Sequence, residues 1–164
     1  MNNKGFTLTE LTVTFALLGI MSAISIPSYF SWLPRHRLQT SVRQIYDDMN
    51  MARSMAVKNN TAAVAIFDIS NDTYTIFLDT VENWALDSSE TVISNGTLEN
   101  DVDITGSTFT SHTYGFNSRG MTKTGAAEGD VYLTNSSGLF LGVRVSTSGC
   151  LTIITSTDGG TTWS

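Results

Sequence analysis

The stretch GFTLTE, from Gly5 to Glu10, and the apolar run LTVTFALLGIMSAISI that follows it to Ile26 decide the fold of this chain. Between Phe6 and Leu33 the only formally charged side chain is Glu10. A helix of about 20 apolar residues can cross a bilayer. Its Thr and Ser hydroxyls are tolerated because they can bond the backbone carbonyl one turn back. We therefore predict one membrane-spanning helix.

The segment before this run differs from a secretory signal peptide. Such a peptide has a basic region, a short apolar core and a small-residue cleavage site. Here the leader, residues 1–5, has one lysine, and the apolar run continues into further helical sequence. Lys4 ahead of the span favours a cytoplasmic N-terminus, although Arg35 and Arg37 flank the other side.

Glu10 needs a physical explanation, because a carboxylate in hydrocarbon costs on the order of 2.5 to 3.5 kcal/mol. One interpretation places it at the headgroup boundary, where water solvates it. The other starts from a cut between Gly5 and Phe6, which creates an ammonium at Phe6. The Glu10 carboxylate of one subunit then pairs with the Phe6 ammonium of a neighbour.

The leader, the glycine, Phe6, Glu10 and the apolar helix together resemble the class III signal of type IV pilins and pseudopilins. This resemblance implies that a prepilin peptidase cuts after Gly5 and that Phe6 becomes N-methylated. It also implies that Glu10 is the assembly glutamate, which neutralises Phe6 of the adjacent subunit. The expected location is a single-pass inner-membrane protein with a cytoplasmic N-terminus and a periplasmic C-terminal domain, which then enters a periplasmic or surface filament.

The sequence after the span predicts an amphipathic helix followed by strands. Apolar residues recur at spacings of three and four, as in one helix face: Val42, Ile45, Tyr46, Met49, Ala52 and Ala56. Asn59 and Asn60 end this pattern with turn-prone residues. The predicted segments are a leader (1–5), a transmembrane and assembly helix (6–33), an amphipathic helix (34–60) and a β-rich periplasmic head (61–164).

Short runs rich in Val, Ile, Thr, Phe and Tyr predict the strands of the head. They are Ala63–Ile69, Thr73–Leu78, Glu90–Ile93, His112–Phe116, Asp130–Thr134, Phe140–Ser146 and Leu151–Thr155. Asn71 and Asp72 are placed to form a hairpin turn between the first two. The predicted class is α+β, with the pilin fold: a long N-terminal helix packed on an antiparallel sheet domain.

Three further strings narrow the resemblance to the GspH/FimT pseudopilin family of minor pilins. Residues 51–60 (MARSMAVKNN) look like the family's ARSxA segment, and residues 116–120 (FNSRG) and 145–149 (VSTSG) are similar to its two strand-turn motifs. The resemblance implies a structural protein of a type II secretion pseudopilus, a type IV pilus tip or a DNA-uptake pilus. Its partners would be other pilins, the prepilin peptidase and the inner membrane, and no cofactor is implied.

Charge argues against the alternative of a DNA-capture minor pilin for natural transformation. The chain has 164 residues, 41% of them hydrophobic and 15% charged, a net charge of -6 and a pI near 4.6. From Asn59 to Ser164, three basic residues face twelve acidic ones. DNA affinity depends largely on cations that replace phosphate counterions. Cys150 and Leu151 also follow Gly149, where DNA-binding FimT proteins carry a Gly-Arg-x-Arg pattern.

Enzymatic and metal sites are not expected. Cys150 has no disulfide partner, and with His36 and His112 alone the chain lacks a zinc ligand set. Cys150 is predicted to be a small buried core residue. Residues 156–163 (STDGGTTW) fit the Asp-box pattern, which predicts a tight hairpin. In it, Asp158 would bond turn amides and Trp163 would pack against the sheet.

Overall fold

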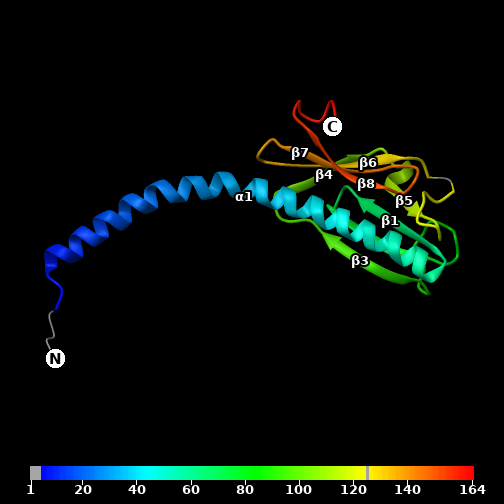
Figure 1. Cartoon of the computed structure of the whole chain (residues 1–164), viewed down its shortest axis with the longest axis horizontal. Helices are drawn as coiled ribbons and strands as arrows, with labels where there is room; N and C mark the ends of the chain where they lie inside the picture. Colours follow the sequence, from blue (N-terminus) through cyan, green and yellow to red (C-terminus); the bar gives the residue numbers. More distant parts are fainter. Residues whose placement is uncertain (1–4, 125) are drawn as a thin grey trace. The chain divides into compact units, whose positions relative to one another are not determined.

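The computed structural model describes residues 5–124 and 126–164. The chain divides into two compact units, residues 1–33 and 34–164, and each is described here by itself. Of the predicted leader, residues 1–4 lie outside the described residues. One helix, α1 (Leu8–Asn59), contributes its first half to the first unit and its second half to the second (Figure 1).

Helix α1 ends where the sequence predicts. Asn60 has a left-handed backbone (φ 50°) and donates its N–H to the Val57 carbonyl at 3.3 Å. Thr61 donates to the Ala56 carbonyl at 3.1 Å. This pair of bonds is a Schellman motif, which satisfies carbonyls at the end of a helix. Lys58 in the last turn adds a favourable charge at the negative end of the helix dipole.

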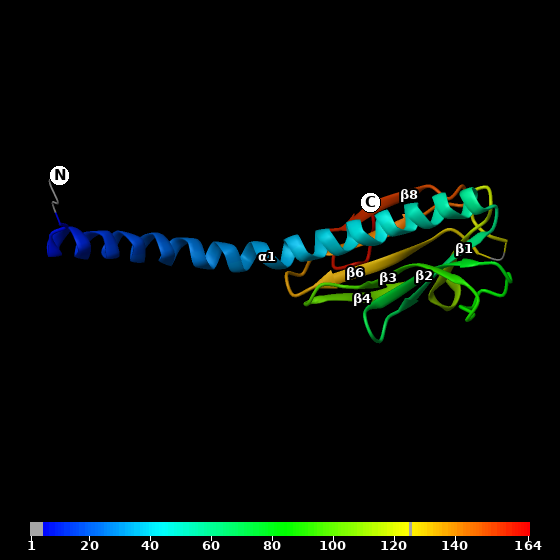
Figure 2. The same cartoon turned by 90° about the horizontal axis from the view of Figure 1, so that it is seen from below.

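The second unit holds two four-stranded antiparallel sheets (Figures 1 and 2). The first has the order β3-β2-β1-β5 and the second the order β4-β6-β7-β8. The strands are β1 (Ala62–Asp68), β2 (Thr73–Asp79), β3 (Thr91–Thr97), β4 (Val102–Ser107), β5 (Thr113–Phe116), β6 (Gly129–Asn135), β7 (Phe140–Val145) and β8 (Leu151–Ser156). A 3-10 turn, η1 (Thr110–His112), precedes β5. The predicted α+β class and pilin fold are confirmed.

All seven predicted strands are present, and the prediction missed β4. The sequence of β4, VDITGS, contains Asp103 and Gly106, both of which disfavour a strand. Tertiary contacts outweigh that propensity: the Ile104 N–H donates to Asp72 Oδ1 at 2.8 Å. Asp72 itself lies in the β1–β2 turn with φ 52°, as the prediction of a hairpin turn there requires.

The main core lies where the second half of α1 packs against both sheets. The buried α1 residues are Leu38, Ser41, Val42, Ile45, Met49, Ala52 and Ala56, with Tyr46 half-buried. The apolar members of this set join side chains of both sheets in one buried cluster. The predicted stripe is therefore the core-facing side of the helix. Each large apolar side chain buried in this way stabilises the fold by roughly 1.5 to 3 kcal/mol.

A second buried layer covers the other face of the β3-β2-β1-β5 sheet. Val64 and Phe77 pair across β1 and β2 and are fully buried, and Gly115 of β5 pairs with Val64 on the other side. The side chains of Trp84 and Lys123 occupy the space over Gly115, where an added Cβ would lie 3.0 and 3.1 Å from them. The loop after β2 thus closes this face.

A buried ion pair fixes that loop. Lys123 Nζ donates to Asp79 Oδ2 and lies 4.3 Å from the centre of the Trp84 ring. Burial raises the pKa of the Asp79 carboxyl, but the bond from Lys123 lowers it. Backbone N–H groups of Trp84 and Asn83, each at 3.2 Å, lower it further. The net result is a pKa of Asp79 below its ordinary value.

Candidate functional site

The N-terminal motif forms a capping box at the start of α1. The Thr7 N–H donates to Glu10 Oε2 at 2.8 Å, and the Glu10 N–H donates to Thr7 Oγ1 at 3.3 Å. The Thr7 hydroxyl also donates to Glu10 Oε2, at 2.7 Å. Two backbone donors that the first turn leaves without helical partners are therefore satisfied reciprocally.

The two sequence-based interpretations of Glu10, as a solvated group and as an intersubunit partner, do not include this local role. The signal was present, because the spacing Thr-x-x-Glu ahead of an apolar run is the signature of a capping box. Both hydrogen bonds that the Glu10 carboxylate accepts, from the Thr7 N–H and the Thr7 hydroxyl, go to Oε2, and within the described residues no hydrogen bond to Oε1 is present. Glu10 can therefore hold the helix start and still offer one oxygen to another group.

The residues of the predicted cleavage site are accessible. Gly5 is exposed, and an added Cβ there would meet nothing within 4 Å. The Phe6 side chain is 92% exposed. Phe6 and Glu10 line the same open surface, together with Thr9, Leu11, Val13 and Thr14. Cleavage after Gly5, methylation of Phe6 and intersubunit pairing of Glu10 all involve other molecules and stay predictions.

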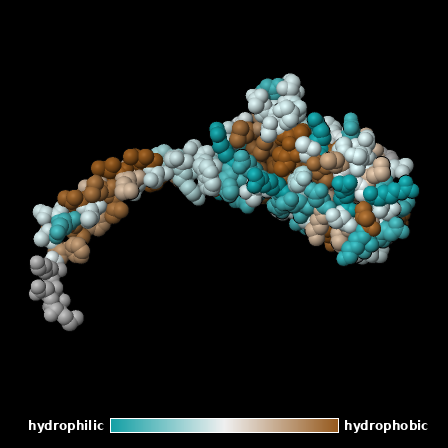
Figure 3. Space-filling view, in the orientation of Figure 1, coloured by the Kyte–Doolittle hydropathy of each residue, from teal (hydrophilic) through white to brown (hydrophobic). Residues whose placement is uncertain are grey.

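The first half of α1 leaves its apolar side chains outside the fold. Every residue from Leu8 to Trp32 is exposed, and Figure 3 shows apolar atoms along this part of the chain. The helix is long and apolar enough to cross a membrane, with a mean hydropathy of 1.8 in its most apolar window. Thr12, Thr14 and Ser25 donate to carbonyls three or four residues back, as expected of hydroxyls in an apolar helix.

The three downstream family motifs meet at one place in the second unit. Arg53, in the ARSxA segment, donates from Nε to the Gly120 carbonyl at 2.7 Å. Gly149, in the last motif, lies against the same carbonyl, and an added Cβ there would lie 2.1 Å from it. Both glycines have left-handed backbones, with φ of 71° and 76°. The residue types of the motifs thus have a structural explanation. Arg53 ties α1 to the turn that contains Gly120. The glycines at 120 and 149 allow that turn and the turn after β7 to approach each other closely.

Further bonds hold these two turns together. The Asn117 side chain accepts from the N–H of Arg119 at 2.9 Å and of Met121 at 3.2 Å, which closes the first turn. Thr122 Oγ1 donates to the Thr147 carbonyl at 2.9 Å and bonds the Tyr114 hydroxyl at 2.8 Å. The turn after β5 is thereby joined to the turn after β7, and through Arg53 to α1. We call this group of contacts the motif junction.

Two of the three cations of the head are neutralised within it. Lys123 pairs with Asp79, and Arg144 forms a bidentate pair with Asp130, with both bonds at 2.8 Å. The hydrogen bond to Asp130 raises the pKa of Arg144. Arg119 is left as the cation of the head without an acidic partner among the described residues. These pairs add no support to the alternative of DNA capture, which needs cations free for phosphates.

The Asp-box segment forms the predicted hairpin. Asp158 Oδ1 accepts from the N–H groups of Thr161 and Thr162 at 3.1 and 2.9 Å. The Trp163 ring stacks on Tyr132 of β6 with centroids 4.3 Å apart. Thr155 and Ser164 exchange backbone bonds at 2.9 and 3.1 Å. The motif is therefore a structural element that fastens the C-terminal residues onto the second sheet.

The remaining candidate residues form no recognisable reactive site. Cys150 is exposed, so the prediction of a buried core residue is wrong. The reason is its place directly after Gly149, in a turn whose inward contact is made by the glycine backbone. His112 Nδ1 bonds Ser107 Oγ at 2.8 Å, but no carboxylate of the described residues orients that imidazole. Within residues 5–124 and 126–164 no group of three metal-ligating side chains is found.

Comparison with known proteins agrees with these features. The family model described as type II transport protein GspH matches residues 41–149. The chain belongs to the GspH family. A second model, the prokaryotic N-terminal methylation motif, matches residues 1–26. Among curated proteins no match is found.

Two solved structures share the fold. The minor pseudopilin EpsH from the type 2 secretion system of Vibrio cholerae has a TM-score of 0.53 at 12% identity, covering 73% of this chain and 97% of that one. The type IV minor pilin FimU of Pseudomonas aeruginosa has a TM-score of 0.54 at 14% identity, covering 73% and 89%. The GspH assignment made from sequence is confirmed.

Proposed function

We propose that this member of the GspH family is a minor pilin or pseudopilin that assembles into, or initiates, a short filament with other pilin-like subunits. The observation that carries the proposal is the first half of α1, whose apolar residues from Leu8 to Trp32 are all exposed although the helix is continuous with a packed head. Apolar surface of this extent requires lipid or other helices around it. The EpsH and FimU folds support both a type II secretion pseudopilus and a type IV pilus.

In this proposal the chain is inserted with its N-terminus in the cytoplasm and its head in the periplasm. A prepilin peptidase removes residues 1–5, and Phe6 becomes the methylated N-terminus. The exposed Gly5 and Phe6 support access by such an enzyme. After extraction from the inner membrane, the helices of neighbouring subunits replace lipid around residues 8–33.

Glu10 would direct this packing by charge. A carboxylate in an apolar helix bundle is costly unless a positive group neutralises it. The ammonium created at Phe6 of an adjacent subunit supplies that charge. The second oxygen, Oε1, can accept a hydrogen bond from this ammonium while Oε2 keeps its two hydrogen bonds from Thr7. Glu10 would then serve both its own helix and the contact between subunits.

The test separates these two roles of Glu10. Glu10→Gln keeps a side chain that can complete a capping box but removes the charge, whereas Thr7→Ala removes the cap and keeps the charge. In cells that assemble the filament, we expect Glu10→Gln to lower incorporation about tenfold, a loss of about 1.4 kcal/mol of pairing, and Thr7→Ala to change it less than about twofold. Normal incorporation of Glu10→Gln would contradict the pairing.

Processing has a separate measurement. Mass spectrometry of the full chain from a strain with an active peptidase should show a methylated phenylalanine at position 6. A chain that retains Met1 under those conditions would contradict the proposal and favour a membrane-anchored protein that keeps its leader.

A further inference from the structure

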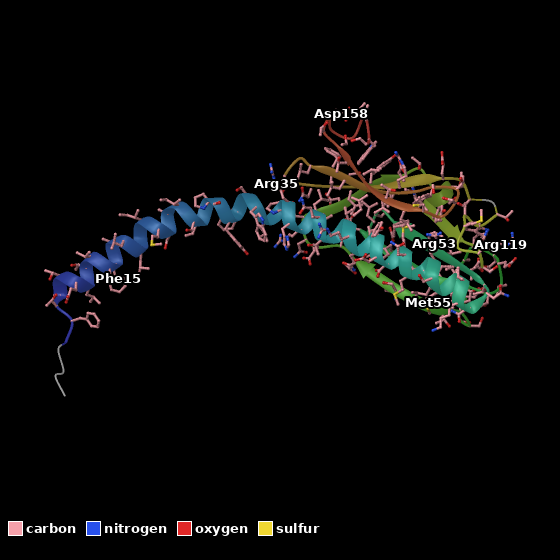
Figure 4. The ribbon with its side chains drawn as sticks, viewed as in Figure 1. Phe15, Arg35, Arg53, Met55, Arg119 and Asp158 are labelled. Atoms are coloured by element: carbon pink, nitrogen blue, oxygen red, sulfur yellow. The ribbon has the colours of Figure 1, made fainter. Side chains whose placement is uncertain are left out.

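An open hollow lies beside the motif junction, on the surface of the second unit. Five residues line it: Asn50, Arg53, Ser54, Val57 and Arg119. Its volume is about 410 Å³. Figure 4 shows Arg53 on α1 and Arg119 on the neighbouring turn at the same end of this unit. We call this hollow the arginine pocket.

The charge of the arginine pocket contrasts with that of the head around it. Its lining includes two guanidinium groups and no carboxylate. The two ion pairs of the described residues, Lys123 with Asp79 and Arg144 with Asp130, lie elsewhere. The segment from Asn59 to Ser164, which contains Arg119, has twelve acidic and three basic residues. Arg53 of α1 lies beside Arg119, and because neither has an acidic partner among the described residues, the two form a local positive site.

Both arginines are placed by bonds that leave guanidinium donors free. Arg53 is fixed by its Nε bond to the Gly120 carbonyl, so its terminal nitrogens remain available. Arg119 follows the Asn117 turn, which holds its backbone N–H at 2.9 Å from Asn117 Oδ1. The Arg119 side chain itself makes no hydrogen bond within the described residues and is exposed. Planar guanidinium groups arranged in this way suit the two oxygens of a carboxylate.

An apolar side chain accompanies the charge: Val57 lines the pocket and is 51% exposed. Met51, which follows Asn50 of the lining in the sequence, and Met121, two residues after Arg119, are 49% and 46% exposed. Arg and Met are enriched at protein interfaces. A free inorganic anion gains nothing from exposed apolar side chains, whereas a protein surface buries them. The exposed Val57 in the lining therefore favours a protein ligand.

We propose that the arginine pocket binds an Asp or Glu side chain of a neighbouring filament subunit. This inference rests on the proposed filament function and adds to it a contact made by the head, distinct from the helix contact at Glu10. The carboxylate accepts hydrogen bonds from Arg53 and Arg119, and the backbone around it covers Met51 and Val57.

The experiment uses the full chain in cells that assemble the filament, with a photo-crosslinking residue at Met51. Arg119→Glu reverses the charge of the pocket, and since the Arg119 side chain makes no bond within the head, the head should still fold. Arg43→Glu is the matched control, because Arg43 is an exposed arginine that lies outside the pocket on α1, the helix that carries Met51 and Arg53. Thermal unfolding of each variant checks its fold.

We expect an adduct with another pilin-like subunit, in which the crosslinked segment contains an Asp or Glu. Arg119→Glu should lower the adduct yield about tenfold, Arg119→Lys should lower it less, and Arg43→Glu should keep it within about twofold. An unchanged yield for Arg119→Glu, an equal loss for Arg43→Glu, or a crosslinked segment without an acidic residue would overturn the inference. Recovery of the chain in the filament fraction is scored separately: if the chain is absent from it, the proposed function fails as well.

Discussion

In the first half of α1, from Leu8 to Leu33, no side chain is buried by the chain's own fold, whereas the second half buries seven residues against two sheets. Both halves have helical backbone and both are rich in apolar residues. The difference lies in periodicity: the second half has one apolar stripe, and the first is apolar on all sides. One helix thus carries one segment whose apolar side chains the chain itself buries and one whose apolar side chains, from Leu8 to Trp32, it leaves exposed.

The largest effect is expected from placing a charge in each half. Ile45 is fully buried and Ile24 is 72% exposed. Ile45→Asp should lower the free energy of unfolding of the head by about 4 kcal/mol or more, because an unpaired carboxylate enters the core. Ile24→Asp should leave the head unchanged within about 0.5 kcal/mol. Denaturant titration of the full chain in micelles, followed by tryptophan fluorescence, measures the free energy of unfolding of both variants. Similar losses of stability in the two variants would contradict the difference between the halves.

The next effect concerns pH: the stability of the head should depend on pH in the acid range, whereas the helical structure of the first half of α1 should not. Because the pKa of Asp79 lies below its ordinary value, the Asp79–Lys123 pair stabilises the head above the usual pKa of an aspartate. That contribution disappears as the pH falls through the lowered pKa. Lys123→Met leaves the Asp79 carboxylate buried without its partner and should cost about 3 kcal/mol at neutral pH.

The loss caused by Lys123→Met should shrink in acid, where Asp79 is protonated in both proteins. Circular dichroism with tryptophan fluorescence across the acid range, in micelles, follows helix and head together. The helical signal of the first half should persist while the head unfolds, because that half contains no group involved in the pair. A loss independent of pH would contradict the assignment of the effect to Asp79.

A smaller effect should follow from crowding the motif junction that anchors the second half. Gly149→Ala places a Cβ 2.1 Å from the Gly120 carbonyl at a left-handed backbone position, and should cost about 2 kcal/mol. Gly138→Ala is the matched control, because Gly138 has φ 72° and an added Cβ there meets nothing within 4 Å. It should cost about 1 kcal/mol. Equal losses in thermal melts would mean that the close approach to Gly120 is unimportant.

The smallest effect is expected at the start of the first half. Thr7→Ala removes one side of the capping box and should cost about 1 kcal/mol of local helix stability. Hydrogen exchange of the first-turn amides in micelles should speed up about fivefold, while the amides of the last turn, near Ala56, stay unchanged. Changes at both ends would show that the two halves are coupled.

The fold was largely predictable from sequence because its signals are local. The stripe from Val42 to Ala56 follows helical periodicity, and Asn60 provides the left-handed residue that ends α1. Strand β4 was missed because its stability comes from pairing with β6 and from the bond between Asp72 and Ile104, which are distant in sequence. The exposure of Cys150 depends on how two turns approach each other, which no local pattern encodes.

The candidate site likewise has one feature that the local sequence encodes and one that depends on residues distant in sequence. The capping role of Glu10 was encoded in its spacing from Thr7 and was overlooked. The arginine pocket could not be predicted, because Arg53 and Arg119 are brought together only by the close approach of the two turns that contain Gly120 and Gly149. Sequence motifs identified the family, but the side chains that they bring together emerged only from the fold.

The exposed thiol of Cys150 is a site for selective chemical labelling. Cys150 is the single cysteine of the chain, and it directly follows Gly149 of the motif junction. A maleimide dye would therefore attach at one position, with no engineered residue, next to the contact that ties α1 to both sheets. Its emission colour and anisotropy would report in real time when a neighbouring molecule covers that end of the head.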